Sequence, residues 1–150
     1  MPKLNDDHAL MTSGVLLAGL GALAVVPKTQ KYTLDPLLEK GKTFESCWGT
    51  VGGADVGITA VSLGIRDIVL ASNKDAKEKT KKNALKVAGF THLAYAAWVG
   101  KAIHQKDFQV APGAVASAAH AGVAGLCLWR GFRKSDDEDK PAPSTATKKK

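Results

Sequence analysis

The chain lacks the residue patterns on which most enzyme active sites and metal sites are built. It contains no GxSxG, no HExxH, no CxxC and no phosphate-binding glycine loop followed by Lys. Its two cysteines, Cys47 and Cys127, are isolated in the sequence. No nucleophile is accompanied by a recognisable base, which argues against an enzyme. We therefore expect no catalytic residues, no metal site and no cofactor.

Aromatic residues are also scarce, at 6% of the chain, and they are not interleaved with the basic residues. The net charge of +7 would suit a nucleic-acid partner, but most lysines flank apolar segments or lie near the C-terminus. Positive charge in those places is typical of the ends of membrane spans. We therefore expect no nucleic-acid partner.

Four apolar blocks, rich in Gly and Ala, are separated by charged segments. Small residues are typical of membrane bundles, because close packing must replace the hydrophobic force that lipid does not supply between helices. The blocks predict an all-α, four-helix transmembrane bundle over residues 1–134, surrounded by a lipid bilayer. Its spans are expected at about 9–27, 50–72, 84–104 and 111–130. A soluble four-helix bundle is the rival architecture, and a signal peptide is the alternative for the first block.

The segments outside the blocks predict a short helix, a tail and an orientation. Residues 35–41 begin with Asp-Pro and end with Gly, which predicts a short interfacial helix after the first span. Residues 135–150 are polar and Lys-rich, and we expect a disordered basic tail. Four spans put both termini on the side that holds more Lys and Arg. That side is then cytoplasmic, matrix or stromal, and an organellar inner membrane is one candidate.

The second block carries charges that a membrane helix has to keep away from lipid. At about 100° per residue, one stripe of this helix contains Asp55, Thr59, Ser62 and Arg66. The stripe predicts either a polar pocket or ion path inside the bundle, or charges near the head groups that cap neighbouring helices. Asp67 points about 100° away from Arg66, so we expect the two side chains not to satisfy each other. We expect Asp67 to turn toward the third or fourth helix.

Small residues predict how the first two helices pack. Gly14, Ala18 and Gly21 follow helical spacing in the first block, and Gly53, Gly57 and Gly64 do so in the second. We expect these two sets to face each other at short range.

Two histidines lie near the middle of the third and fourth blocks. His92 and His120 are expected at similar depth, where they either hydrogen-bond between helices or, as the alternative, ligate a haem iron or a metal. Cys47 and Cys127 are expected near opposite membrane surfaces, about 30 Å apart, too far for a disulfide.

The sequence Gly64-Ile65-Arg66-Asp67 in the second helix, the short helix after the first span and His120 in the fourth resemble a known group. They are similar to small four-helix membrane proteins of unknown function that are distantly related to the DoxX group. The resemblance covers roughly residues 10–132 and implies the fold, without an activity. The lysine-rich link before the third block and Lys101 depart from that group's pattern.

These observations favour a small integral membrane protein that acts as a non-catalytic accessory or structural subunit of a larger membrane assembly. Its expected partners are the bilayer and other membrane protein subunits. The alternative is a proton-linked or small-solute carrier that uses the polar stripe of the second helix together with His92 and His120. A redox or haem-binding enzyme is the third hypothesis.

Overall fold

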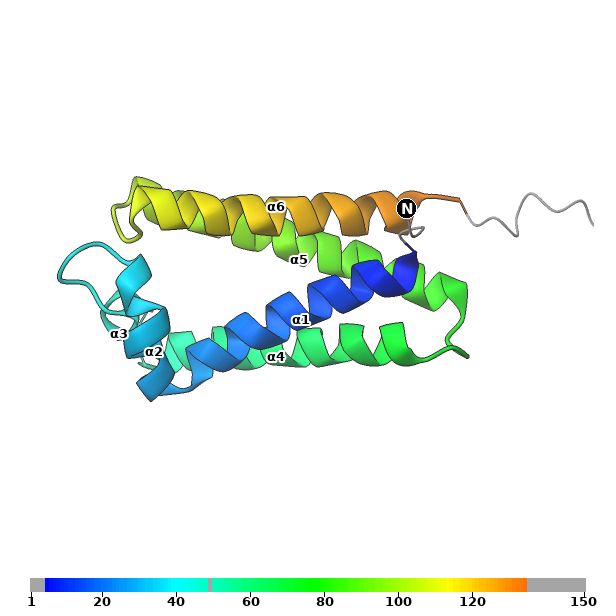
Figure 1. The fold of residues 1–150 in the computed structure, drawn as a ribbon, viewed down its shortest axis with the longest axis horizontal. Helices are drawn as coiled ribbons and strands as arrows, with labels where there is room; N and C mark the ends of the chain where they lie inside the picture. Colours follow the sequence, from blue (N-terminus) through cyan, green and yellow to red (C-terminus); the bar gives the residue numbers. More distant parts are fainter. Residues whose placement is uncertain (1–4, 49, 135–150) are drawn as a thin grey trace, which may run out of the picture.

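The computed structural model describes residues 5–48 and 50–134, in which all the named elements are helical (Figure 1). Within these ranges the chain forms no strand, and the predicted all-α class is confirmed. The helices in order are α1 (Asp6–Val25), α2 (Pro27–Thr33), the 3-10 helix η1 (Asp35–Leu37), α3 (Phe44–Trp48), α4 (Thr50–Ser72), α5 (Glu78–His104) and α6 (Val110–Phe132). The tail predicted at 135–150 lies outside the described residues.

Two of the long helices begin earlier than the hydropathy of the sequence predicts. The side chain of Asn5 accepts a hydrogen bond from the His8 amide and so caps α1, with Asp6 and Asp7 in the first turn. Helix α5 takes in part of the lysine-rich link, because it begins at Glu78. The cap and the acidic first turn extend α1, and helix-forming Glu and Lys residues extend α5, beyond their apolar segments.

Length and composition mark two helices of the described chain, α1 and α6, as able to cross a membrane. Four such helices were predicted. Helix α4 falls short because it carries Asp55, Arg66 and Asp67, and α5 falls short because lysines at its start and His92, Lys101 and His104 further along lower its mean hydropathy.

The long helices pack as two close pairs, α1 with α4 and α5 with α6. In the first pair the backbones nearly touch: a Cβ added at Gly64 would lie 2.6 Å from the carbonyl oxygen of Gly14, and one added at Gly21 would lie 2.6 Å from that of Gly57. Only glycine allows this approach. Gly53 does not belong to this contact, because its Cα faces the ring of Phe44 in α3.

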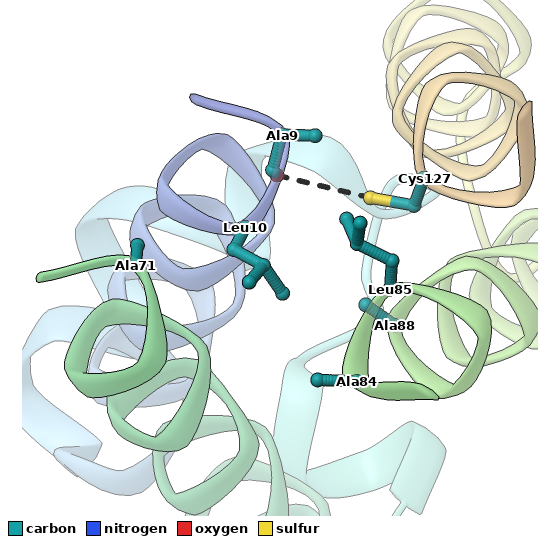
Figure 2. Close-up of a cluster of buried hydrophobic side chains, with 7 residues drawn as sticks. All are labelled: Ala9, Leu10, Ala71, Ala84, Leu85, Ala88 and Cys127. Atoms are coloured by element: carbon teal, nitrogen blue, oxygen red, sulfur yellow. Dashed lines mark hydrogen bonds between the residues drawn. The ribbon is translucent and has the colours of Figure 1, made fainter. Parts of the chain in front are cut away.

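The two pairs meet at the end of the bundle where α1 begins and α6 ends, here called the terminus end (Figure 1). Figure 2 shows the buried cluster there, to which all four long helices contribute: Ala9, Leu10, Ala71, Ala84, Leu85, Ala88 and Cys127. Ion pairs join the helix ends beside it, from Arg130 to Asp6 at 2.6 Å and from Lys81 to Asp7 at 2.7 Å. The four helices are thus tied together at this end.

The opposite end, here called the loop end, holds α2, η1, α3 and the turn between α5 and α6. A second cluster is buried there, formed by Ala24, Leu38, Phe44, Ala102 and Phe108. Lys42 donates a hydrogen bond to Asp107, which raises the pKa of the lysine above its ordinary value.

The helix predicted at 35–41 is wrong in extent. Only Asp35–Leu37 is helical, as one 3-10 turn, and Leu38 forms an isolated antiparallel bridge with Phe108. The amide of Gln109 donates to the carbonyl of Leu37 at 3.0 Å, so the α5–α6 turn takes the backbone groups that a longer helix would use internally. A short helix does follow the first long one, but it is α2, which begins at Pro27.

Candidate functional site

Four polar side chains meet inside the bundle, one from each long helix. They are Ser13 of α1, Asp67 of α4, His92 of α5 and His120 of α6. The first three are fully buried and His120 is 5% exposed. Such groups are costly to bury unless they bind one another, so their mutual contacts decide what the site can do.

The four side chains form one continuous hydrogen-bonded chain. The Ser13 hydroxyl donates to Oδ2 of Asp67 at 2.8 Å, and Nε2 of His92 lies 3.1 Å from the same hydroxyl oxygen. Nδ1 of His92 lies 2.8 Å from Nδ1 of His120. His92 and His120 thus form a hydrogen bond between helices, which is the first of the two expected arrangements. The complete chain connects a carboxylate in α4 to an imidazole in α6.

Arg66 neutralises the carboxylate at the start of this chain. Its Nε and Nη2 atoms donate to Oδ1 of Asp67 at 3.0 and 2.7 Å. The expectation that these neighbours would not satisfy each other is wrong, because the long arginine side chain folds back to reach the buried carboxylate. Asp67 turns into the bundle and binds Ser13 of α1, whose hydroxyl also contacts His92 of α5.

Counting donors and acceptors along the chain fixes where the protons lie. The Ser13 hydroxyl donates its single hydrogen to the carboxylate of Asp67. Its oxygen can therefore only accept a hydrogen bond from Nε2–H of His92. A neutral His92 then accepts at Nδ1, and Nδ1–H of His120 is the donor. Nε2 of neutral His120 is therefore a bare acceptor.

This geometry differs from that of a nucleophilic triad. In a Ser-His-Asp triad the histidine lies between the serine and the carboxylate, so that it can take the serine's proton. Here Ser13 lies between Asp67 and His92, gives its hydrogen to the carboxylate and is fully buried. The chain is suited to holding or relaying a proton, and not to acyl transfer.

The histidine pair also does not fit an axial haem site. Two nitrogens on opposite sides of an iron would lie roughly 4 Å apart, at about 2.0–2.1 Å per bond. The facing Nδ1 atoms of His92 and His120 are 2.8 Å apart and bind each other. Within the described residues no group of three or more His, Cys, Asp or Glu side chains is placed to hold a metal ion.

An apolar cavity of about 110 Å³ lies beside the far end of the chain, between the two helix pairs and toward the loop end. His120 lines this cavity together with Tyr95, whose ring stacks on the imidazole at a centroid distance of 5.3 Å. Leu17, Ala60 and Val99 are among its apolar walls. The polar chain therefore runs from a neutralised carboxylate to the wall of an apolar cavity.

The structure divides the polar stripe predicted on the second helix. Asp55, Thr59 and Ser62 are exposed on the outer side of α4, and the Ser62 hydroxyl donates to the carbonyl of Ile58 in its own helix. Only Arg66 and the adjacent Asp67 belong to the site. These three residues lie on the side of α4 opposite Gly57 and Gly64, which pack on α1.

Sequence reasoning missed Ser13. A local signal was present, because Ser13 directly precedes Gly14, one of the small residues that face α4, and is a polar residue in an uncharged apolar block. Asp67 follows Gly64 by three residues, a spacing that puts it close to the same face of α4. Cys47 and Cys127 are both free, as predicted.

Comparison of the chain with family models, with curated proteins and with solved structures gives no match. The resemblance to proteins distantly related to the DoxX group therefore stays a prediction.

Proposed function

We propose that this chain is an integral membrane protein whose helices α1, α4, α5 and α6 cross the bilayer, and that it acts as a non-catalytic subunit of a larger membrane assembly. The observation that carries this proposal is the number of large apolar side chains exposed on the outer surface of the long helices, while Ser13, Asp67, His92 and His120 are buried together with the apolar clusters of the interior. A soluble bundle buries most of its large apolar side chains and keeps its charged groups outside.

The outer faces of the two helices with charged residues support their insertion into lipid. On α4, Ile58, Ile65 and Val69 are each more than half exposed, and on α5 Val87 and Phe90 are 46% and 57% exposed. Asp67 is hidden inside the bundle and pairs with Arg66. Because Asp67 is buried and Arg66 is paired with it, both charges cost less free energy near the centre of a bilayer than they would if they faced lipid.

The small residues of α6 support docking against another subunit. Ala114, Ala118, Ala121 and Gly125 are exposed and follow helical spacing along one face. A Cβ added at Gly125 would meet nothing within 4 Å, in contrast to the glycines between α1 and α4. The same kind of surface that joins α1 to α4 is thus free on α6, where a transmembrane helix of a partner subunit fits.

Two measurements test this proposal. Alkaline carbonate should leave the protein in the membrane pellet, and native electrophoresis in mild detergent should place it in a complex larger than the monomer. Gly125→Leu should release the monomer, whereas the control Val115→Leu, at a side chain that is 72% exposed, should not. Extraction by carbonate would refute the membrane assignment, and a monomeric wild type would refute the subunit assignment.

A proton-linked carrier is the second candidate, favoured by the continuous chain from Asp67 to His120. The polar path of such a carrier would be this interior chain, since Asp55, Thr59 and Ser62 lie outside it. Purified protein in liposomes should then acidify the lumen in response to a solute gradient, and Asp67→Asn should abolish that response. The absence of solute-coupled proton movement would eliminate this candidate.

A further inference from the structure

The cavity between the helix pairs has the size of a single ring. Its volume is about 110 Å³, of the same order as the roughly 150 Å³ of an engineered apolar cavity that admits benzene, and it opens to the outside beside Leu20 and Val56, which are 38% and 41% exposed. Helices α1 and α4 form one side of it, and α5 and α6 form the other. An occupant would therefore contact both helix pairs at once.

The walls of the cavity are apolar except at a few atoms. Among the described residues that line it, only Tyr95, Trp98 and His120 carry a side-chain nitrogen or oxygen. An ion or a strongly hydrated solute would lose its water there without replacement, so the walls select an apolar molecule.

His120 presents one unused hydrogen-bonding atom to this space. Its Nδ1 binds His92, and its Nε2 has no partner among the described residues. Every fully enclosed side-chain nitrogen or oxygen among the described residues has a hydrogen-bond partner, so Nε2 is not fully enclosed, and His120 is one of the residues that line the cavity. The order of donors and acceptors along the hydrogen-bonded chain that starts at Asp67 leaves Nε2 of His120 without a hydrogen. Nε2 can therefore only accept a hydrogen bond.

We propose that this cavity binds a ring-sized apolar alcohol of the phenol class, whose hydroxyl donates to Nε2 of His120. A ketone or an ether of the same size would bring its lone pairs against that of Nε2, and a hydrocarbon would leave Nε2 unsatisfied. The stacked ring of Tyr95 holds the imidazole in place beside the ligand. This site goes beyond the subunit role and does not depend on the helices spanning a bilayer.

Phenol is the probe for the first experiment, with anisole as the comparison because its oxygen cannot donate. Phenol is titrated into detergent-purified protein labelled with ¹⁵N-histidine, and the Nε2 resonance of His120 is followed. Phenol should move this resonance saturably and anisole should not. Equal responses to both compounds, or no response to phenol, would overturn the proposal.

Two variants with matched controls locate the site. Ala116 lines the cavity and is half-buried, so Ala116→Leu should fill the space and abolish phenol binding, whereas Ala119→Leu, at an exposed position of the same helix, should not. His120→Phe should weaken phenol binding by about tenfold through loss of the acceptor, and His104→Phe at the exposed end of α5 should leave it unchanged.

Ala116→Leu retains the polar chain, so it keeps the test decisive even if His120→Phe does not fold. Partition of phenol into the detergent is common to all variants and cancels in their comparison. If phenol binds Ala116→Leu as tightly as the wild type, the cavity is not its site.

Discussion

The approach of α1 to α4 can be tested with two glycines that lie two residues apart on one helix. A Cβ added at Gly21 would lie 2.6 Å from the carbonyl oxygen of Gly57 and 2.7 Å from the amide nitrogen of Val61. Both are backbone atoms, which cannot swing aside as the end of a side chain can. A Cβ added at Gly19 would meet nothing within 4 Å. Gly21→Ala should therefore push the helices apart, and Gly19→Ala should not.

The magnitude follows from the opposing terms in each variant. Either substitution gains up to about 1 kcal/mol of helix propensity, which cancels when the variants are compared. To reach an ordinary contact of 3.4 Å, the helices at Gly21 must separate by several tenths of an ångström. Overpacking of this kind costs about 1–3 kcal/mol. Gly21→Ala should thus be less stable than Gly19→Ala by about 1–3 kcal/mol.

Unfolding in detergent, followed by far-ultraviolet circular dichroism against rising denaturant, measures this difference directly. Gly19→Ala serves as the control for the general effect of alanine on α1, because the residue is exposed. Equal free energies of unfolding for the two variants would show that α1 and α4 do not pack closely at Gly21 and Gly57.

Two further outcomes are expected from the interior contacts. Arg66→Ala leaves the fully buried carboxylate of Asp67 without its cation and should lower the free energy of unfolding by about 1–3 kcal/mol, since Arg66 itself is 36% exposed. Lys79→Ala, at an exposed position, should change it by less than about 0.5 kcal/mol, and equal losses would argue against the Arg66–Asp67 pair. In the folded protein a maleimide should label the half-buried Cys47 much faster than Cys127, which is fully buried; rapid labelling of both cysteines would contradict the packing of α6.

The sequence by itself determined where most of the helices lie. Apolar blocks bounded by charged segments predicted the middle of every long helix, and α4 covers the range expected for the second block. The small residues at Gly14, Gly21, Gly57 and Gly64 also lie between the first two long helices. These features depend on local composition and on a helical period of about 3.6 residues, both of which can be read directly from the chain.

Only the tertiary structure decided that Asp67 faces the interior and that Asp55, Thr59 and Ser62 do not. Periodicity gives the angle between Asp55 and Asp67 around the helix, but not the direction in which either points. Contact with α1 turns Asp67 inward and leaves Asp55 exposed. The extent of η1 was decided in the same way, because its backbone groups bind a turn that is distant in the sequence.

The polar chain and the cavity were also decided by tertiary structure. Ser13, His92 and His120 come from three different helices, and their hydrogen bonds require those helices to be in register to within a fraction of a turn. That register is set by glycine contacts, ion pairs at the terminus end and the bridge between Leu38 and Phe108 at the loop end. Composition specifies that polar groups are present in apolar helices, but the packing of the helices determines which of these groups meet.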